Sequence, residues 1–156
     1  MNATNEGTAG LSARQIVNTR IVNASRELVW KAWTDPKHII HWWGPTGFTN
    51  TIHEMDVRPG GTWRFIMHGP DGTNYENENL YLEVVKPERL IYEHVSPPKH
   101  SVKTTFEECE GKTKITMEMT FATAEERDTT VEKYGAVEGM KQTLGRMAEY
   151  VANWTE

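Results

Sequence analysis

The sequence has a single cysteine, Cys109, and no apolar run near the length of a membrane-spanning helix. One cysteine cannot form a disulfide within the chain, so the fold does not depend on one. A helix needs about 20 apolar residues to cross a bilayer, whereas the hydrophobic residues, 37% of the total, are scattered. Residues 1–13 also lack the basic start and apolar block of a signal peptide. These absences predict a cytoplasmic protein with no membrane span and a flexible N-terminal tail over residues 1–13.

Basic residues are too few for binding to polyanions. The chain has 17 Lys and Arg against 22 Asp and Glu, a net charge of −5, and no dense basic run. Nucleic acids and anionic membranes are therefore poor partners, since their binding requires basic side chains that neutralise phosphates. A length of 156 residues fits one domain with a sizeable core. We expect that domain to cover residues 14–156.

Motifs for metal binding and nucleophilic catalysis are also missing. No nucleophile elbow, serine triad or HExxH pattern occurs. His38 and His41 are three residues apart, a spacing that can bring two imidazoles to one metal, but no third ligand is apparent. Gly60 and Gly61 favour a hairpin turn over a phosphate-binding loop, because no helix follows them. The sequence predicts no metal and no cofactor.

One carboxylate is a weak candidate for acid–base chemistry. In a strand, alternation places Glu93 on the face of Ile91 and Val95, opposite Tyr92 and His94. Apolar surroundings would raise the pKa of the carboxyl group. An ion pair with an arginine is the commoner arrangement, so catalysis is the minor interpretation.

Period-two alternation and turn residues predict an antiparallel meander. β-Branched residues over 15–23 indicate a first strand. Ser25 and Asp35-Pro36 can each begin a short helix, the second extending through Trp43. Further strands are expected at 51–57, 62–68, 75–85, 89–96, 101–109 and 112–121.

The C-terminal region predicts a long amphipathic helix. Thr123 and Glu126 form a capping-box pattern. Apolar residues at steps of three and four between Val137 and Trp154 then indicate a helix of about five turns. Glycines at 135, 139 and 145 should weaken this helix by roughly 1 kcal/mol each relative to alanine. They leave either a void under the helix or room for close contact with the sheet, and the sequence supports both equally.

Tryptophan and methionine are unusually frequent, with six and seven copies. Such side chains line adaptable apolar cavities, although they also fill ordinary cores. Trp42 and Trp43, at the end of the second short helix, are candidates for a cavity lip or for a hydrophobic plug. If this tryptophan corner is exposed, it would be a natural homodimer contact.

Four ordered motifs resemble a known family. They are Trp33-Thr-Asp-Pro36, Trp42-Trp43-Gly-Pro45, Asp56-Val-Arg-Pro-Gly-Gly-Thr-Trp63 and Pro87-Glu-Arg-Leu90. Together they are similar to bacterial and archaeal homologues of the C-terminal domain of the heat-shock-protein-90 ATPase activator. That family belongs to the START-like, helix-grip superfamily, which includes birch-pollen-allergen-type proteins and polyketide cyclases. The match covers about residues 16–154.

The resemblance implies an α+β helix-grip fold. In it, a curved antiparallel sheet of six or seven strands and two short helices wrap around a long C-terminal helix, with a cavity beneath that helix. The superfamily includes lipid carriers, hormone receptors and cyclases, so the fold does not name a ligand.

We therefore expect a carrier, sensor or sequestration protein that binds a small, mostly hydrophobic molecule. Trp43, Tyr81 and Tyr92 are expected to orient the polar end of that molecule. The candidate binding residues are Trp43, Trp63, Phe65, Met67, Tyr81, Tyr92, Met117, Met119, Met140 and Leu144. Two alternatives stay open: a cyclase-like or hydrolase-like enzyme using the same cavity, and a co-chaperone or stress-related interaction module with a chaperone as partner. Which strand face lines the cavity is also open.

Overall fold

Seven antiparallel strands form one sheet in the computed structural model, which describes residues 13–154. The order across the sheet is β1-β7-β6-β5-β4-β3-β2. The strands are β1 Gln15–Val22, β2 Thr49–Met55, β3 Thr62–His68, β4 Asn74–Val85, β5 Arg89–His94, β6 His100–Cys109 and β7 Lys112–Thr120. Apart from Ala13, the tail expected over residues 1–13 lies outside the described residues.

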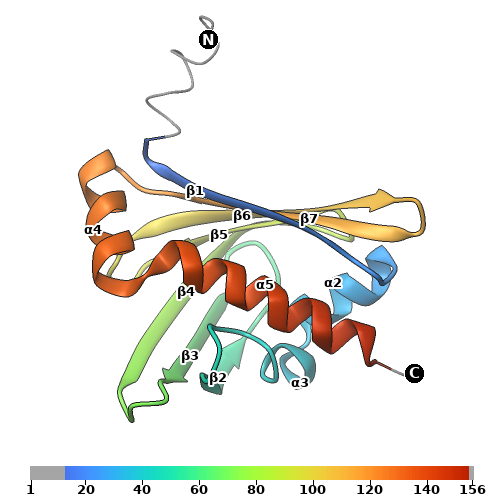
Figure 1. The fold of residues 1–156 in the computed structure, drawn as a ribbon, viewed down its shortest axis with the longest axis horizontal. Helices are drawn as coiled ribbons and strands as arrows, with labels where there is room; N and C mark the ends of the chain where they lie inside the picture. Colours follow the sequence, from blue (N-terminus) through green and yellow to red (C-terminus); the bar gives the residue numbers. More distant parts are fainter. Residues whose placement is uncertain (1–12, 155–156) are drawn as a thin grey trace, which may run out of the picture.

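Four helices accompany the sheet in the described part of the chain: α2 Arg26–Thr34, α3 Pro36–Ile39, α4 Ala124–Tyr134 and α5 Ala136–Ala152. Figure 1 shows α5 crossing the concave side of the curved sheet, with α4 at one end of it and α2 and α3 at the other. The α+β helix-grip class expected from the sequence is confirmed, with seven strands.

Side-chain caps fix where the helices begin. Ser25 Oγ accepts a hydrogen bond from Leu28 N at 3.3 Å at the start of α2. Asp35 Oδ1 accepts one from Lys37 N at 2.9 Å, and proline occupies the first position of α3. Thr123 Oγ1 accepts one from Glu126 N at 3.0 Å at the start of α4. Each cap satisfies a backbone donor that the first helical turn leaves free, so the three predicted helix starts are confirmed.

The second short helix ends earlier than expected, and its tryptophans are not exposed. The helix stops at Ile39, and Trp42 and Trp43 lie in the turns that follow. Trp42 is only 1% exposed. Its Nε1 donates to Ala32 O at 3.1 Å, and its ring packs edge-on against Trp33 at 4.7 Å. Trp42 is therefore buried and Trp43 half-buried, so the condition for a homodimer contact at this corner, exposed tryptophans, is not met.

The expectation that Gly135 lies inside the long helix is also wrong. Gly135 has a φ of 61°, in the left-handed region, and it separates α4 from α5. Its N–H donates to Val131 O at 2.9 Å and closes α4. Glycine adopts this conformation with little steric cost, which is why it commonly ends helices. The chain thereby changes direction before α5 crosses the sheet (Figure 1).

The core lies between the concave sheet face and α5. Trp63 and Phe65 of β3 point inward and stack at 4.5 Å. From α5, Leu144 and Met147 are fully buried in the same cluster. The buried apolar side chains of β3, β5 and β7 therefore lie on the concave face, which settles the strand face that the sequence left open, whereas Val17 and Ile21 of β1 are exposed.

The close approach of the backbone in the β2–β3 hairpin can be tested at Gly61. In Gly61→Ala, the new Cβ would lie 2.0 Å from the backbone oxygen of Asp56, so the hairpin has to shift. We expect unfolding in urea to show a loss of at least about 2 kcal/mol, since overpacking in a rigid environment costs this much. The control is Gly145→Ala in α5, whose Cβ would meet only Arg20 at 4.0 Å. It should stabilise the protein by up to about 1 kcal/mol through helix propensity. Equal effects of the two substitutions would contradict the structure.

Candidate functional site

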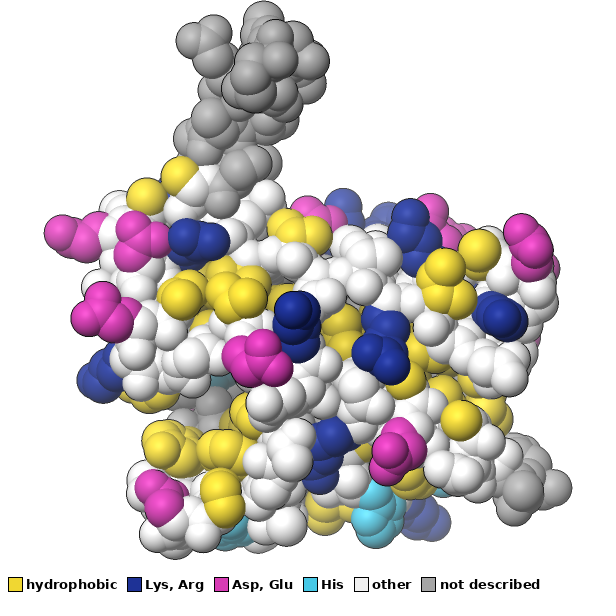
Figure 2. Space-filling model, in the orientation of Figure 1, with side chains coloured by type: hydrophobic (Ala, Val, Ile, Leu, Met, Phe, Trp, Pro, Cys, Tyr) yellow, Lys and Arg dark blue, Asp and Glu magenta, His cyan; other side chains and the backbone are white. Residues whose placement is uncertain are grey.

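A cavity of about 570 Å³ opens between the concave sheet face, the α4–α5 region and the loop after α3. Figure 2 shows the surface hollowed between α4 and the strand ends below it. Residues of β3, β4, β5, β6 and β7 form its floor, and residues of α4, α5 and the loop Trp43 to Phe48 form its sides. The glycines of the C-terminal helix predicted either a void under the helix or close contact with the sheet, and this cavity is such a void.

The loop that forms one side is tied to α5. Arg146 Nη1 donates to Gly44 O and to Pro45 O, each at 2.9 Å, and Gln142 Oε1 accepts from Thr46 N at 3.0 Å. Gly44 lies so close to the sheet that a Cβ would approach the methyl carbon of Met67 to 2.8 Å. Since hydrogen bonds and close packing both hold the loop, this side of the cavity is preformed.

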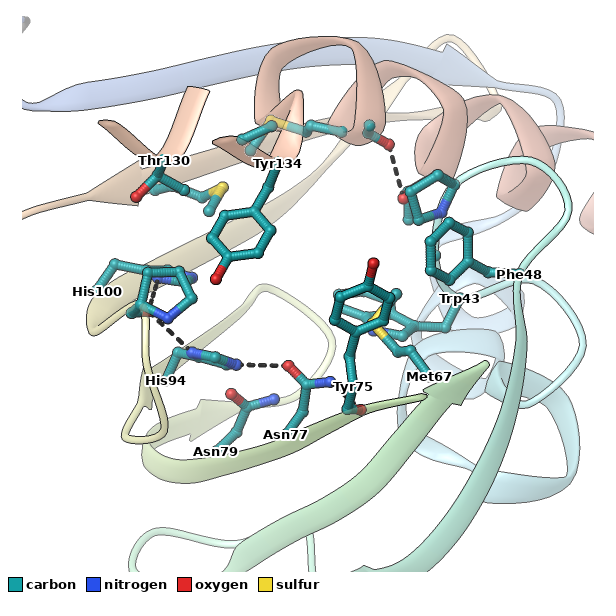
Figure 3. Close-up of a pocket in the computed structure, with 18 of the residues that line it drawn as sticks. Trp43, Phe48, Met67, Tyr75, Asn77, Asn79, His94, His100, Thr130 and Tyr134 are labelled. Atoms are coloured by element: carbon teal, nitrogen blue, oxygen red, sulfur yellow. Dashed lines mark hydrogen bonds between the residues drawn. The ribbon is translucent and has the colours of Figure 1, made fainter. Parts of the chain in front are cut away.

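Seven of the ten candidate residues line the cavity: Trp43, Phe65, Met67, Tyr92, Met117, Met119 and Met140. They make one region of it aromatic and thioether-rich (Figure 3). The remaining three, Trp63, Tyr81 and Leu144, are buried in the core and do not line it. Trp63 and Tyr81 stack on each other at 6.4 Å and support the floor from the side. Of the three residues expected to orient a polar group, Trp43 and Tyr92 are thus at the cavity and Tyr81 is not.

A row of polar side chains crosses the floor next to this apolar region. Asn79 of β4 pairs with His94 of β5, and His94 pairs with His100 of β6. All three line the cavity, together with Asn77, two residues before Asn79 on the same strand face. Figure 3 shows them side by side, with the hydroxyl of Tyr134 turned toward them from α4. The adjacent row is Tyr81, Tyr92 and Val102, so the floor changes from apolar to polar in one step along the strands.

Hydrogen bonds hold the histidines of this row. Pro98 O accepts from His94 Nδ1 at 3.0 Å and from His100 Nδ1 at 2.7 Å. The two rings stack at 4.7 Å, and His94 Nε2 lies 2.7 Å from Asn77 Oδ1. By contrast, Asn79 Oδ1 is buried and has no hydrogen-bond partner among the residues described. A buried polar atom without a partner is rare in folded proteins and requires an explanation.

Burial keeps this row uncharged near neutral pH. It lowers the pKa of His94, and it lowers the pKa of His100 to about 4, with a further contribution from the neighbouring His94. Burial likewise raises the pKa of the Tyr92 hydroxyl. The charged residues among those lining the cavity are Glu76 and Lys133, and both are exposed to solvent. The polar end of the cavity therefore offers hydrogen-bonding groups without a formal charge.

The carboxylate considered for acid–base chemistry is not in the cavity. Glu93 is exposed and points away from the face of Tyr92 and His94. It shares a strand face with Ile91, as alternation predicts, but that face is on the solvent side of the sheet, so the carboxyl group does not have the apolar surroundings that acid–base chemistry would need. The ion pair with an arginine is not seen with Arg64 or Arg89, because Arg64 pairs with Glu54 and Arg89 with Glu83.

The sequence interpretation missed the polar row as a unit. Asn77 and Asn79 alternate with glutamates before Tyr81, which is a period-two signal that they share an inward face. His94 was assigned to the face of Tyr92, and it does lie there. The pairing of His94 with Asn79 and with His100 depends on the register of three strands, and no local pattern gives that register.

The histidines at 38 and 41 take part in an aromatic cluster. His38 Nδ1 lies 2.8 Å from the Tyr150 hydroxyl, and its ring stacks on Trp154 at 4.0 Å. His41 stacks on Tyr150. In residues 13–154 no group of three or more His, Cys, Asp or Glu side chains could hold a metal ion. Within the same residues, no helix is long and apolar enough to cross a membrane.

Residues 23–152 match the family model described as activator of Hsp90 ATPase homolog 1-like protein. The match covers most of the chain, so the protein belongs to this family, as the four motifs indicated. No curated protein matches the chain.

Solved structures share the fold at low identity. A protein from Arthrobacter aurescens is 22% identical with a TM-score of 0.85, over 93% of this chain and 90% of that one. Protein Ms6760 from Mycobacterium smegmatis is 24% identical with a TM-score of 0.82, over 94% and 95%. A protein from Rhodobacter sphaeroides is also 24% identical with a TM-score of 0.82, over 92% and 96%. At this identity the likeness shows the fold alone.

The buried histidines predict a pH dependence of stability. Between a pKa of 6.5, the ordinary value for histidine, and about 4, an unfolded chain binds a proton at position 100 that the folded protein does not bind. Folding free energy is therefore lost as the pH falls through this window. In His100→Gln, we expect thermal unfolding to depend less steeply on pH between 4 and 6.5 than in the unchanged protein.

His100→Phe keeps an aromatic ring beside His94 and should flatten the pH profile in the same way. Carboxylates titrate in both proteins and cancel from the comparison. Profiles that run parallel to that of the unchanged protein would contradict the buried, neutral state of His100.

Proposed function

We propose that this protein binds a small, mostly hydrophobic molecule in the cavity beneath α5, as a carrier, sensor or sequestering protein. The domain responsible is taken to span residues 14–156. The observation that carries the proposal is the combination of an apolar wall with one uncharged polar row in a preformed cavity. Small-molecule sites have this composition: mostly apolar, with a few polar groups that fix orientation.

The size of the cavity supports the same function. Its volume of about 570 Å³ lies within the range of roughly 300–1,000 Å³ that is usual for small-molecule pockets. Methionines at positions 67, 117, 119 and 140 supply flexible thioether side chains that adapt to different ligand shapes. A cytoplasmic location, expected from the single cysteine, stays a prediction.

A cavity-filling variant tests the proposal. Met119 is half-buried in the cavity wall, so Met119→Trp should occupy space that a ligand would use. The neutral fluorescent probe N-phenyl-1-naphthylamine should bind the unchanged protein saturably and bind Met119→Trp at least about tenfold more weakly, a loss of ~1.4 kcal/mol. Fluorescence titration, with competition by unlabelled apolar compounds, measures this difference.

The matched control places the same residue outside the cavity. Leu82 is on β4 and is 49% exposed, so Leu82→Trp adds a tryptophan without filling the cavity. It should bind the probe as the unchanged protein does. Equal binding by both variants would show that the probe binds elsewhere, and absence of binding by the unchanged protein would remove the support for a ligand cavity.

The family description makes a chaperone the second candidate partner, since it names an activator of a chaperone ATPase. Such an interaction would use the exterior of the domain. If the unchanged protein and Met119→Trp stimulate a heat-shock-protein-90 ATPase equally, the result would favour this second function, because filling the cavity leaves the exterior unchanged.

A further inference from the structure

The unpaired amide oxygen of Asn79 marks a place where a ligand group belongs. Its side chain is 1% exposed, its Oδ1 has no partner in the described part of the chain, and it lines the cavity. Nε1 of Trp63, its neighbour on β3, also lacks a partner there, but Trp63 does not line the cavity. A buried acceptor in a cavity wall is most simply explained as one half of a hydrogen bond whose donor comes from the ligand.

The two histidines of the row also present acceptors. A carbonyl oxygen only accepts hydrogen bonds, so Pro98 O requires a proton on Nδ1 of both rings. A neutral ring that carries its proton on Nδ1 has a lone pair on Nε2. His94 Nε2 faces the oxygen of Asn77, whose Nδ2 donates to Tyr75 O at 2.9 Å. Two acceptors therefore face each other there, and the Ser96 hydroxyl, 3.4 Å from His94 Nε2, is a long donor to the ring. A donor from a ligand would give these acceptors a closer partner.

The neutral donors among the lining residues include the Asn79 amide N–H groups and the Tyr92 and Tyr134 hydroxyls, and none of them carries the charge that would compensate a carboxylate. The hydroxyls of Thr130 and Thr143 donate to backbone oxygens of their own helices, so only their lone pairs remain. Tyr134, turned toward the histidines, can donate one hydrogen bond (Figure 3). The charged lining residues, Lys133 and Glu76, are exposed and opposite in sign. A carboxylate beside the row would thus face several acceptors without a buried cation to compensate its charge.

We propose that Asn79, His94 and His100 form a head-group subsite that selects ligands with an uncharged hydrogen-bond donor, such as a hydroxyl or amide N–H, and discriminates against carboxylates. The inference rests on the proposed function and specifies its ligand class: an apolar, aromatic-compatible body that ends in a hydroxyl or amide. Fatty-acid anions and aryl carboxylates are excluded by the same contacts.

A series of ligands with one body and different head groups tests the subsite. Naphthalene, 2-naphthol, 2-naphthamide and 2-naphthoate are titrated into the protein at pH 7.5, with affinities measured by calorimetry or by chemical-shift changes. Because 2-naphthol and 2-naphthamide can each form one additional neutral hydrogen bond in the subsite, we expect them to bind about tenfold more tightly than naphthalene. The carboxylate should bind more weakly than naphthalene.

Asn79→Leu removes the amide while keeping a side chain of similar size. It should reduce the preference for 2-naphthol over naphthalene to about twofold or less and leave naphthalene binding unchanged or tighter. The control is Thr104→Val, which removes another buried, unpaired oxygen that does not line the cavity. This variant should keep the full preference for 2-naphthol.

The outcomes separate the two proposals. If all four compounds bind the unchanged protein with similar affinity, or if 2-naphthoate binds most tightly, the head-group subsite is wrong while ligand binding in the cavity stands. If none of them binds, naphthalene included, both proposals fail. The ranking in the unchanged protein decides the inference even if a variant does not fold.

Discussion

The position of α5 on the sheet determines whether this protein has a cavity at all. A single 17-residue helix cannot cover the whole concave face of seven strands. Its main contacts are with β1, α2 and α4. Leu144 and Met147 are buried on this side, and the strands β3, β4 and β5 curve away from the helix (Figure 1). The cavity is the part of the concave face that α5 leaves uncovered.

Gly135 and Arg146 maintain that position. The left-handed conformation of Gly135 separates α5 from α4, so the two helices take different directions. Arg146 then fixes α5 to the loop after α3 through backbone carbonyls rather than through a carboxylate. Neither constraint uses the side chains of Asn79, His94 or His100. An unpaired Asn79 oxygen is therefore compatible with the position of the helix.

The sequence predicted the elements well because their signals are local. Period-two alternation, caps such as Thr123 and the steps of three and four in α5 depend only on neighbouring residues. The errors arose where a distant contact decides the outcome. Trp42 is buried because Ala32 and Trp33 are packed against it, and Gly135 ends a helix because the chain has to turn there. The polar row is a further non-local feature, since its three members come from three strands.

The related structures share the fold of this protein, but they do not identify its ligand. Backbones align over more than nine-tenths of this chain at identities of 22–24%, so these proteins share the fold, whereas the chemistry of the cavity depends on the side chains of this sequence. In this chain the row is an asparagine and two histidines, and burial lowers the pKa of both histidines so that they stay uncharged near neutral pH. An arginine or lysine at position 79 or 100 would supply the cation that an anionic head group needs, on the same backbone. A basic residue in this row is therefore expected to favour anionic ligands, at a cost in stability when no ligand compensates the buried charge.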